Sequence, residues 1–219
     1  MIFESYLDRK LKLPDFSAFE SLVIDPKTVE RLLNQIGDYD PELLSHCLRV
    51  GDLASRSSHH LPLPWRRSIT TAALLHDIGK TYIPKSITAG DSTLTDDQWV
   101  MMKDHVSIGA DIVWREIGNR PIRYLVGWHH VHQQSAYPFD YEKVMKTKNP
   151  ARRESHIWRA SKILAGCDQV DALLSPRSYK QAWSFETVVN KLVENGFSLE
   201  ESIRYTKLGA ELHSGLRNN

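Results

Sequence analysis

The sequence of 219 residues contains only two cysteines, Cys47 and Cys167, and neither lies in a CxxC pair. A disulfide framework is therefore not expected, and a reducing cytoplasm is the expected compartment. No apolar run approaches the length of a membrane span, and the first residues, MIFESYLDRKLK, are charged where a secretory signal would be apolar. The sequence thus predicts a soluble cytoplasmic protein without a membrane partner.

Charge of one sign is also lacking, since 28 lysines and arginines face 27 aspartates and glutamates. Without a net field, a nucleic-acid polymer is not an expected partner. The oligomeric state stays open.

Sustained alternation of apolar and polar residues, which would indicate half-buried strands, is missing as well. Apolar residues instead recur at helical spacing, in segments that often begin with Asp-Pro or Pro and end in Gly. Helices are expected over 25–37, 40–56, 63–80, 95–118, 120–130, 155–175, 184–196 and 199–215. The predicted class is all-α, a bundle of about seven to eight helices. Residues 1–37 are expected to form an N-terminal arm and short helix packed on a domain of residues 38–219, with 139–155 as a long surface loop.

Histidine is abundant, with ten residues, and several lie on helical faces that otherwise carry apolar side chains. His76, for example, shares a face with Ile69 and Ala73. A single inward histidine is more often a hydrogen-bonded core residue than a metal ligand. Several inward polar groups in one core would each need a partner, however, and one shared cation satisfies them together. The inward-facing set is His46, His76, His105, His129 and Asp168, whereas His59, His60, His156 and His213 are expected on the surface.

The order of the polar motifs resembles the HD superfamily of metal-dependent phosphohydrolases. HDIGK at 76–80 has His46 upstream, and MKDH at 102–105, HH at 129–130 and CDQVDAL at 167–173 follow it. More narrowly, the chain from about residue 38 to about 195 is similar to the HD-GYP branch, the cyclic di-GMP phosphodiesterases. The fold this implies is an HD-domain helical bundle around a metal centre.

The resemblance implies two divalent transition-metal ions, with Asp77 bridging them. His46, His76, Asp77 and Asp168 would hold one ion, and Asp77, His105, His129 and His130 the other. Glu42 matches a carboxylate that lets some members hold a third ion. The mixture of imidazole and carboxylate ligands favours iron or manganese over zinc or nickel.

The substrate side of the resemblance is less complete. Lys80 matches the family's phosphate-binding lysine, and Arg177 and Lys180 match basic residues that contact nucleotide phosphates. The family's HHxxxDGxGYP motif is HHVHQQSAYP here, one residue shorter, with Tyr137 kept and Ala136 in place of a glycine. We expect this change to alter the nucleotide pocket and to leave the metal site intact. His132 is expected to lie in a surface loop.

The expected function is metal-dependent hydrolysis of a phosphodiester, with a cyclic dinucleotide such as cyclic di-GMP as substrate and Asp77 and Lys80 as catalytic residues. In the expected mechanism, a hydroxide shared by the metals attacks phosphorus. Three alternatives stay open: a nucleotide phosphomonoesterase, a di-iron oxygenase of the same fold, and a non-catalytic nucleotide receptor. Lys80 and the basic cluster favour phosphate over dioxygen, and the complete ligand set argues against a receptor.

Overall fold

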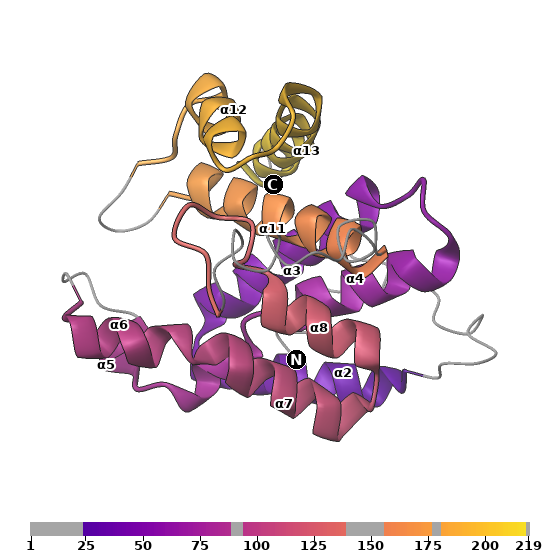
Figure 1. Cartoon of the computed structure of the whole chain (residues 1–219), viewed down its shortest axis with the longest axis vertical. Helices are drawn as coiled ribbons and strands as arrows, with labels where there is room; N and C mark the ends of the chain where they lie inside the picture. The colour runs from indigo at the N-terminus through magenta and orange to yellow at the C-terminus, as the bar shows by residue number, and fades with distance from the viewer. Residues whose placement is uncertain (1–23, 89–93, 139–155, 177–180, 218–219) are drawn as a thin grey trace, which may run out of the picture.

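The computed structural model describes residues 24–88, 94–138, 156–176 and 181–217 (Figure 1). These residues form helices, turns and loops without any strand, so the predicted all-α class is confirmed. The elements are α2 (Pro26–Tyr39), α3 (Pro41–Ser57), α4 (Leu63–Leu75), the 3-10 helix η2 (Ile78–Tyr82), α5 (Lys85–Thr88), α6 (Asp96–Lys103), α7 (His105–Ile117), α8 (Arg120–Trp128), α11 (His156–Leu174), α12 (Phe185–Glu194) and α13 (Leu199–Arg217).

Local sequence signals set most of the helix starts. The Asp25 carboxylate accepts from the backbone N–H of Lys27, and Asp40 does the same for Glu42 at the start of α3. Thr95 and Gln98 form the expected capping box at the start of α6. Each cap satisfies an N–H group that has no partner within its own helix. The expected starts of these helices therefore agree with the structure to within one residue.

Two expected helices are interrupted, and both interruptions position a side chain of the candidate site. The helix expected over 63–80 ends at Leu75, and the chain continues through His76 and Asp77 into η2. The helix expected over 95–118 is divided at Asp104 into α6 and α7. Consequently, the described residues contain nine helices of eight or more residues, against the seven to eight expected.

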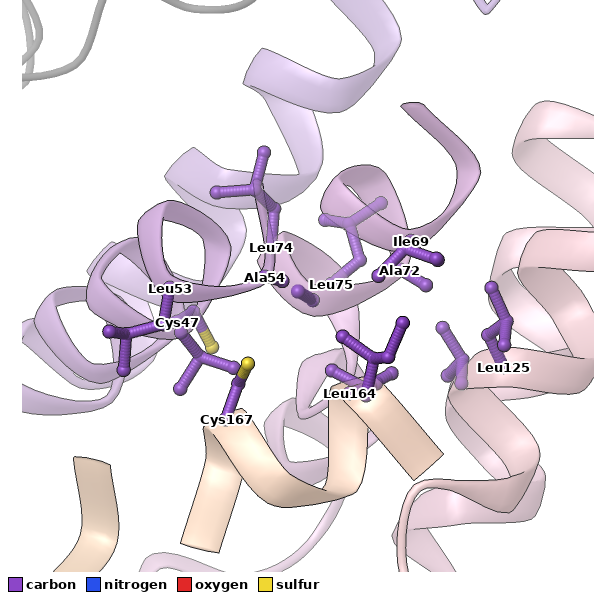
Figure 2. Close-up of a cluster of buried hydrophobic side chains, with 14 of the residues drawn as sticks. Cys47, Leu53, Ala54, Ile69, Ala72, Leu74, Leu75, Leu125, Leu164 and Cys167 are labelled. Atoms are coloured by element: carbon purple, nitrogen blue, oxygen red, sulfur yellow. The ribbon is translucent and has the colours of Figure 1, made fainter. Parts of the chain in front are cut away.

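The core lies where α3, α4, α8 and α11 meet. Figure 1 shows α11 crossing the middle of the molecule, with α12 and α13 on one side and α7 and α8 on the other. Figure 2 shows how side chains of the four central helices interlock around Leu53, Leu75, Leu125 and Leu164. Burying one such leucine contributes roughly 1.5–3 kcal/mol.

Both cysteines are buried in this core as free thiols, as expected (Figure 2). The Cys167 thiol lies 3.5 Å from the Ser57 hydroxyl, and burial raises its pKa to about 12. Such a thiol stays protonated and acts as a small core side chain.

The helix α2 buries Leu32, Leu33 and Ile36 in the same core. The boundary at residue 37 stays a prediction, and the rest of the proposed arm and the expected loop 139–155 lie outside the described residues. None of the described helices combines the length and the apolarity that crossing a bilayer requires.

Candidate metal centre

Two groups of potential metal ligands lie side by side at the centre of the helical bundle. The acidic group consists of His46 from α3, His76 after α4, and Asp168 from α11. The histidine group consists of His105 from α7 and of His129 and His130 after α8. Asp77 lies between the two groups and forms a third set of this kind with His76 and His129. Within each group the candidate ligand atoms all lie within 4.8 Å of one another.

The turn between α4 and η2 places His76 and Asp77. The ring Nδ1 of His76 lies 2.8 Å from the Ala73 carbonyl, which leaves Nε2 directed away from that helix. Gly79 allows η2 to pack directly on α7, since a Cβ atom there would lie only 2.0 Å from the His105 carbonyl oxygen. The glycine of the HDIGK motif therefore brings Asp77 next to His105.

The acidic group gathers around one oxygen of Asp77. The His46 Nε2 atom lies 3.1 Å from Asp168 Oδ1 and 3.9 Å from Asp77 Oδ2. His76 Nε2 lies 3.4 Å from Asp77 Oδ2 and 3.6 Å from Asp168 Oδ1. Ligands that share an ion at about 2.0–2.2 Å are roughly 3–4 Å apart. These separations therefore suit one bound ion.

The histidine group gathers around the other oxygen of the same carboxylate. Asp77 Oδ1 lies 3.3 Å from His105 Nε2 and 3.9 Å from His129 Nε2, and these two nitrogens are 3.3 Å apart. The Nδ1 atoms of both rings lie 2.6 Å from backbone carbonyls three residues earlier, at Met102 and Val126. Such contacts fix the proton on Nδ1 and leave Nε2 as the ligand atom. The break between α6 and α7 at Asp104 thus orients the His105 ring.

Two atoms at the junction of the groups are buried without a hydrogen-bond partner among the described residues: His76 Nε2 and Asp77 Oδ1. A buried polar atom without a partner costs about 1–3 kcal/mol. A cation in each group would satisfy both atoms at once. The donor set and these two atoms therefore fit the pair of ions that the sequence predicts.

In the acidic group, opposite charges on neighbouring side chains stabilise one another. Burial raises the pKa of Asp77, but the charges of Lys80 and His76 outweigh it and hold that pKa well below its usual value. Burial lowers the pKa of His76, but the charge of Asp77 outweighs it and holds that pKa well above 6.5. The Lys80 ammonium lies 2.6 Å from Asp77 Oδ2.

The histidine group consists of neutral rings near pH 7. Burial lowers the pKa of His105 to about 4 and that of His130 to about 3. Burial and the neighbouring His130 hold the pKa of His129 well below its usual value. Neutral imidazole is the form that binds metal ions, so these three rings need not release a proton first.

The other expected site residues differ in their placement. Tyr137 stacks on His130, with ring centroids 4.6 Å apart, and faces the edge of the His105 ring. Glu42 is exposed in the first turn of α3 and belongs to none of the ligand groups among the described residues. Arg177 and Lys180 lie outside the described residues.

The prediction that His132 lies on the surface is wrong. The residue is 7% exposed, its ring packs against Trp158 with centroids 4.3 Å apart, and its Nε2 atom lies 2.9 Å from the Ser161 hydroxyl. The ring is buried because the chain turns inward after α8 and packs on α11, a contact that the loop sequence alone does not reveal. His59 and His60 are exposed as expected, and the side chain of His156 is outside the description.

The surface placement expected for His213 is wrong too. Its Nε2 atom lies 3.0 Å from Asp171 Oδ1, and Asp171 is fully buried. Asp171 also lies 2.7 Å from His46 Nδ1 and accepts hydrogen bonds from Arg49. Sequence reasoning assigned Asp171 no role, although its position one turn after Asp168 places both on one face of α11.

Comparison with known proteins gives a family match and several relatives. The HD domain family matches residues 43–173. A cyclic di-GMP phosphodiesterase of Thermotoga maritima is 30% identical over 185 residues, which is 81% of this chain and 46% of that protein. The 3′3′-cGAMP-specific phosphodiesterase 2 of Vibrio cholerae is 31% identical over 168 residues, 75% of this chain and 30% of its own. The chain thus spans less than half the length of either relative.

Among solved structures, the HD domain of the L. monocytogenes phosphodiesterase PgpH, in complex with cyclic di-AMP, has a similar fold. Its TM-score is 0.59 at 16% sequence identity, over 86% of this chain and 98% of that one. The match of the family model over residues 43–173 spans more than half of the sequence. The chain belongs to the HD domain family.

Proposed function

We propose that this protein is a metal-dependent phosphodiesterase that holds two divalent ions, iron or manganese, and opens a cyclic dinucleotide. The observation that carries the proposal is the division of Asp77, with Oδ2 facing the acidic group and Oδ1 facing the histidine group. One carboxylate between two sets of nitrogen and oxygen donors is suited to a pair of ions. The names of the related proteins supply the substrate class.

Divalent ions bound in the two groups would lower the pKa of a water molecule and neutralise charge on a phosphoryl group. The chain's own residues complete the site. The Lys80 side chain is 23% exposed, with its ammonium 2.6 Å from Asp77 Oδ2. A phosphate that enters from solvent can therefore accept a hydrogen bond from Lys80 next to the metal ligands, where the charge of the ammonium stabilises a developing anion.

Tyr137 would form one wall of the substrate site. Its ring lies on His130, and the Lys103 ammonium is 6.0 Å from the ring centroid. Two contacts anchor the shortened segment before Tyr137. The Gln133 side chain contacts the His130 ring, and the Gln134 backbone N–H donates to the Asn195 side chain. This arrangement supports a substrate pocket of altered shape beside a complete metal centre. We therefore expect slower cleavage of cyclic di-GMP than of an unhindered activated phosphodiester.

The test uses purified protein reconstituted with Mn²⁺ or, without oxygen, with Fe²⁺. Substrates are bis(p-nitrophenyl) phosphate, cyclic di-GMP, 3′3′-cGAMP, cyclic di-AMP and nucleotide monophosphates, with products separated by chromatography. We expect two ions per chain, a linear dinucleotide as first product, and no release of phosphate from monoesters. Asp168→Asn should lower the rate at least 100-fold, since it removes an acidic ligand. Asp111→Asn, which changes an exposed carboxylate on α7, should behave like wild type.

Each alternative predicts its own outcome. Phosphate release from monoesters alone would favour a phosphomonoesterase. Protein that binds two ions and cleaves none of these esters would favour a nucleotide receptor or an oxygenase. The cytoplasmic location expected from the two unpaired cysteines, and the division of the chain at residue 37, stay proposals.

A further inference from the structure

Asp171 is the centre of a buried hydrogen-bonded cluster behind the candidate ligand His46. Its Oδ1 atom lies 2.7 Å from Arg49 Nε and 3.0 Å from His213 Nε2. Its Oδ2 atom lies 2.7 Å from His46 Nδ1, 3.0 Å from Arg49 Nη2 and 3.3 Å from the Ser175 hydroxyl. Because Arg49 spans both oxygens, the carboxylate cannot rotate without breaking several contacts.

The His46 ring is held between two carboxylates with different roles. Asp171 faces Nδ1, and Asp168, a proposed ligand, lies 3.1 Å from Nε2. A carboxylate that accepts from Nδ1 fixes the proton on that nitrogen and leaves the Nε2 lone pair for a metal ion. Arg49 offsets the charge of Asp171, so the cluster behind the ring adds little net charge to the centre.

His213 connects this cluster to the C-terminal helix. It lies on α13, which packs on both α3 and α11 (Figure 1). Its side chain is 13% exposed, and its Nε2 atom contacts Asp171 Oδ1, whereas the Ser175 hydroxyl contacts Oδ2. The three helices that meet here thus each supply a member: Arg49 from α3, Asp171 from α11 and His213 from α13.

We propose that Asp171, Arg49 and His213 form a positioning cluster that fixes the His46 ring for its ion, and that His213 couples α13 to the acidic group. The inference rests on the proposed metal centre. A purely structural contact between α13 and α11 predicts something different. In that case, loss of His213 would destabilise the fold without favouring loss of one ion over the other.

The first experiment counts Mn²⁺ ions retained per chain as the chelator concentration rises. Asp171→Asn and His213→Ala should weaken one ion about 10- to 100-fold, the usual effect of removing an outer partner of a ligand, and leave the other unchanged. His213→Gln, whose amide can donate to Asp171, should restore much of the lost affinity. Thr206→Ala is the matched control, since Thr206 is fully buried on α13 and its hydroxyl donates to the Ser202 carbonyl of the same helix.

The positioning cluster is refuted in two cases. One is that His213→Ala and Thr206→Ala each weaken the binding of both ions to the same extent, and the other is that His213→Ala retains both ions as wild type does. The second experiment needs no metal: long-range ¹H–¹⁵N NMR of the imidazole nitrogens, at a pH where the rings are neutral. We expect His46 in the Nδ1-protonated form in wild type and a shift toward the Nε2-protonated form in Asp171→Asn. Wild-type protein that binds no ion but has this tautomer would refute the metal centre and keep the positioning cluster. An Nε2-protonated His46 in wild type would overturn the cluster itself.

Discussion

Asp77→Asn is the substitution that separates a pair of linked ions from two independent sites. The side chain is buried, and its two oxygens face different ligand groups. Asparagine keeps the size of the side chain but replaces one oxygen by an amide nitrogen and removes the charge. One group therefore loses its donor atom and both groups lose the negative charge, whereas Asp168→Asn changes a ligand only in the acidic group.

The expected magnitude follows from the linkage between binding and folding. Ions supplied at about 100 times their dissociation constant stabilise the fold by about 2.7 kcal/mol each, or roughly 5 kcal/mol for two. A loss of about 100-fold in affinity at both sites reduces this to about 0.4 kcal/mol each. For a chain of this size, 1 kcal/mol corresponds to about 2–4 °C in Tm. The rise in Tm on adding metal should therefore fall from roughly 10–20 °C to a few degrees.

The assay is thermal unfolding with and without Mn²⁺, combined with elemental analysis of dialysed protein. Asp111→Asn serves as the control for loss of a carboxylate far from the ligands, and it should keep the full rise. Asp168→Asn should keep about half of the rise, because the histidine group still has its ligands. An Asp77→Asn protein with the same metal-induced rise as wild type would show that the carboxylate does not join two ions.

Three further predictions test the surroundings of the centre. Gly79→Ala should lower stability by roughly 3 kcal/mol and weaken binding of the ion at His105, since the new Cβ meets the His105 carbonyl. The control is Gly215→Ala, whose Cβ meets no atom within 4 Å and which should change neither stability nor ion binding. Equal Tm values for the two variants would refute the close approach at Gly79. Burial lowers the pKa of His132 to about 3, so only the unfolded chain gains its proton as pH falls below 6.5. This contribution should make metal-free wild type lose about 1 kcal/mol more stability from pH 7.5 to 5.5 than His132→Asn does, as measured by urea unfolding. Glu42→Gln should keep two ions and lower activity modestly; loss of both ions would make Glu42 a primary ligand.

Much of the fold and of the candidate site could be predicted because both depend on the same periodicity. A ligand on a helix that faces the centre of a bundle lies at core spacing, as His76 does after Ile69 and Ala73. The inward histidines and Asp168 were therefore visible before the structure. The assignment of His130 as a ligand and the two separate ligand sets on either side of Asp77 rest on the resemblance to the family, since neither follows from spacing.

The two interrupted helices could not be predicted from the same pattern. The residues around Asp104 keep helical spacing on both sides, and the segment contains no proline or glycine at the break. The His105 ring instead contacts the Met102 carbonyl at 2.6 Å, and α6 buries no side chain of its own. Tertiary contacts of α7 with η2 decide the path of the chain here, and a propensity argument does not contain them.

The partners behind the ligands were missed for a related reason. His213 follows Thr206 and Gly209 at helical spacing, and both are buried, so it lies on the inward face of α13. Its burial is created by α3 and α11, which lie more than 35 residues away in the sequence. A ligand must point into the core of its own helix bundle, but a residue that orients a ligand needs only to reach the boundary between helices. Periodicity therefore shows that Asp171 and His213 face inward, but it does not show that they orient a ligand, and that role must be sought in the structure.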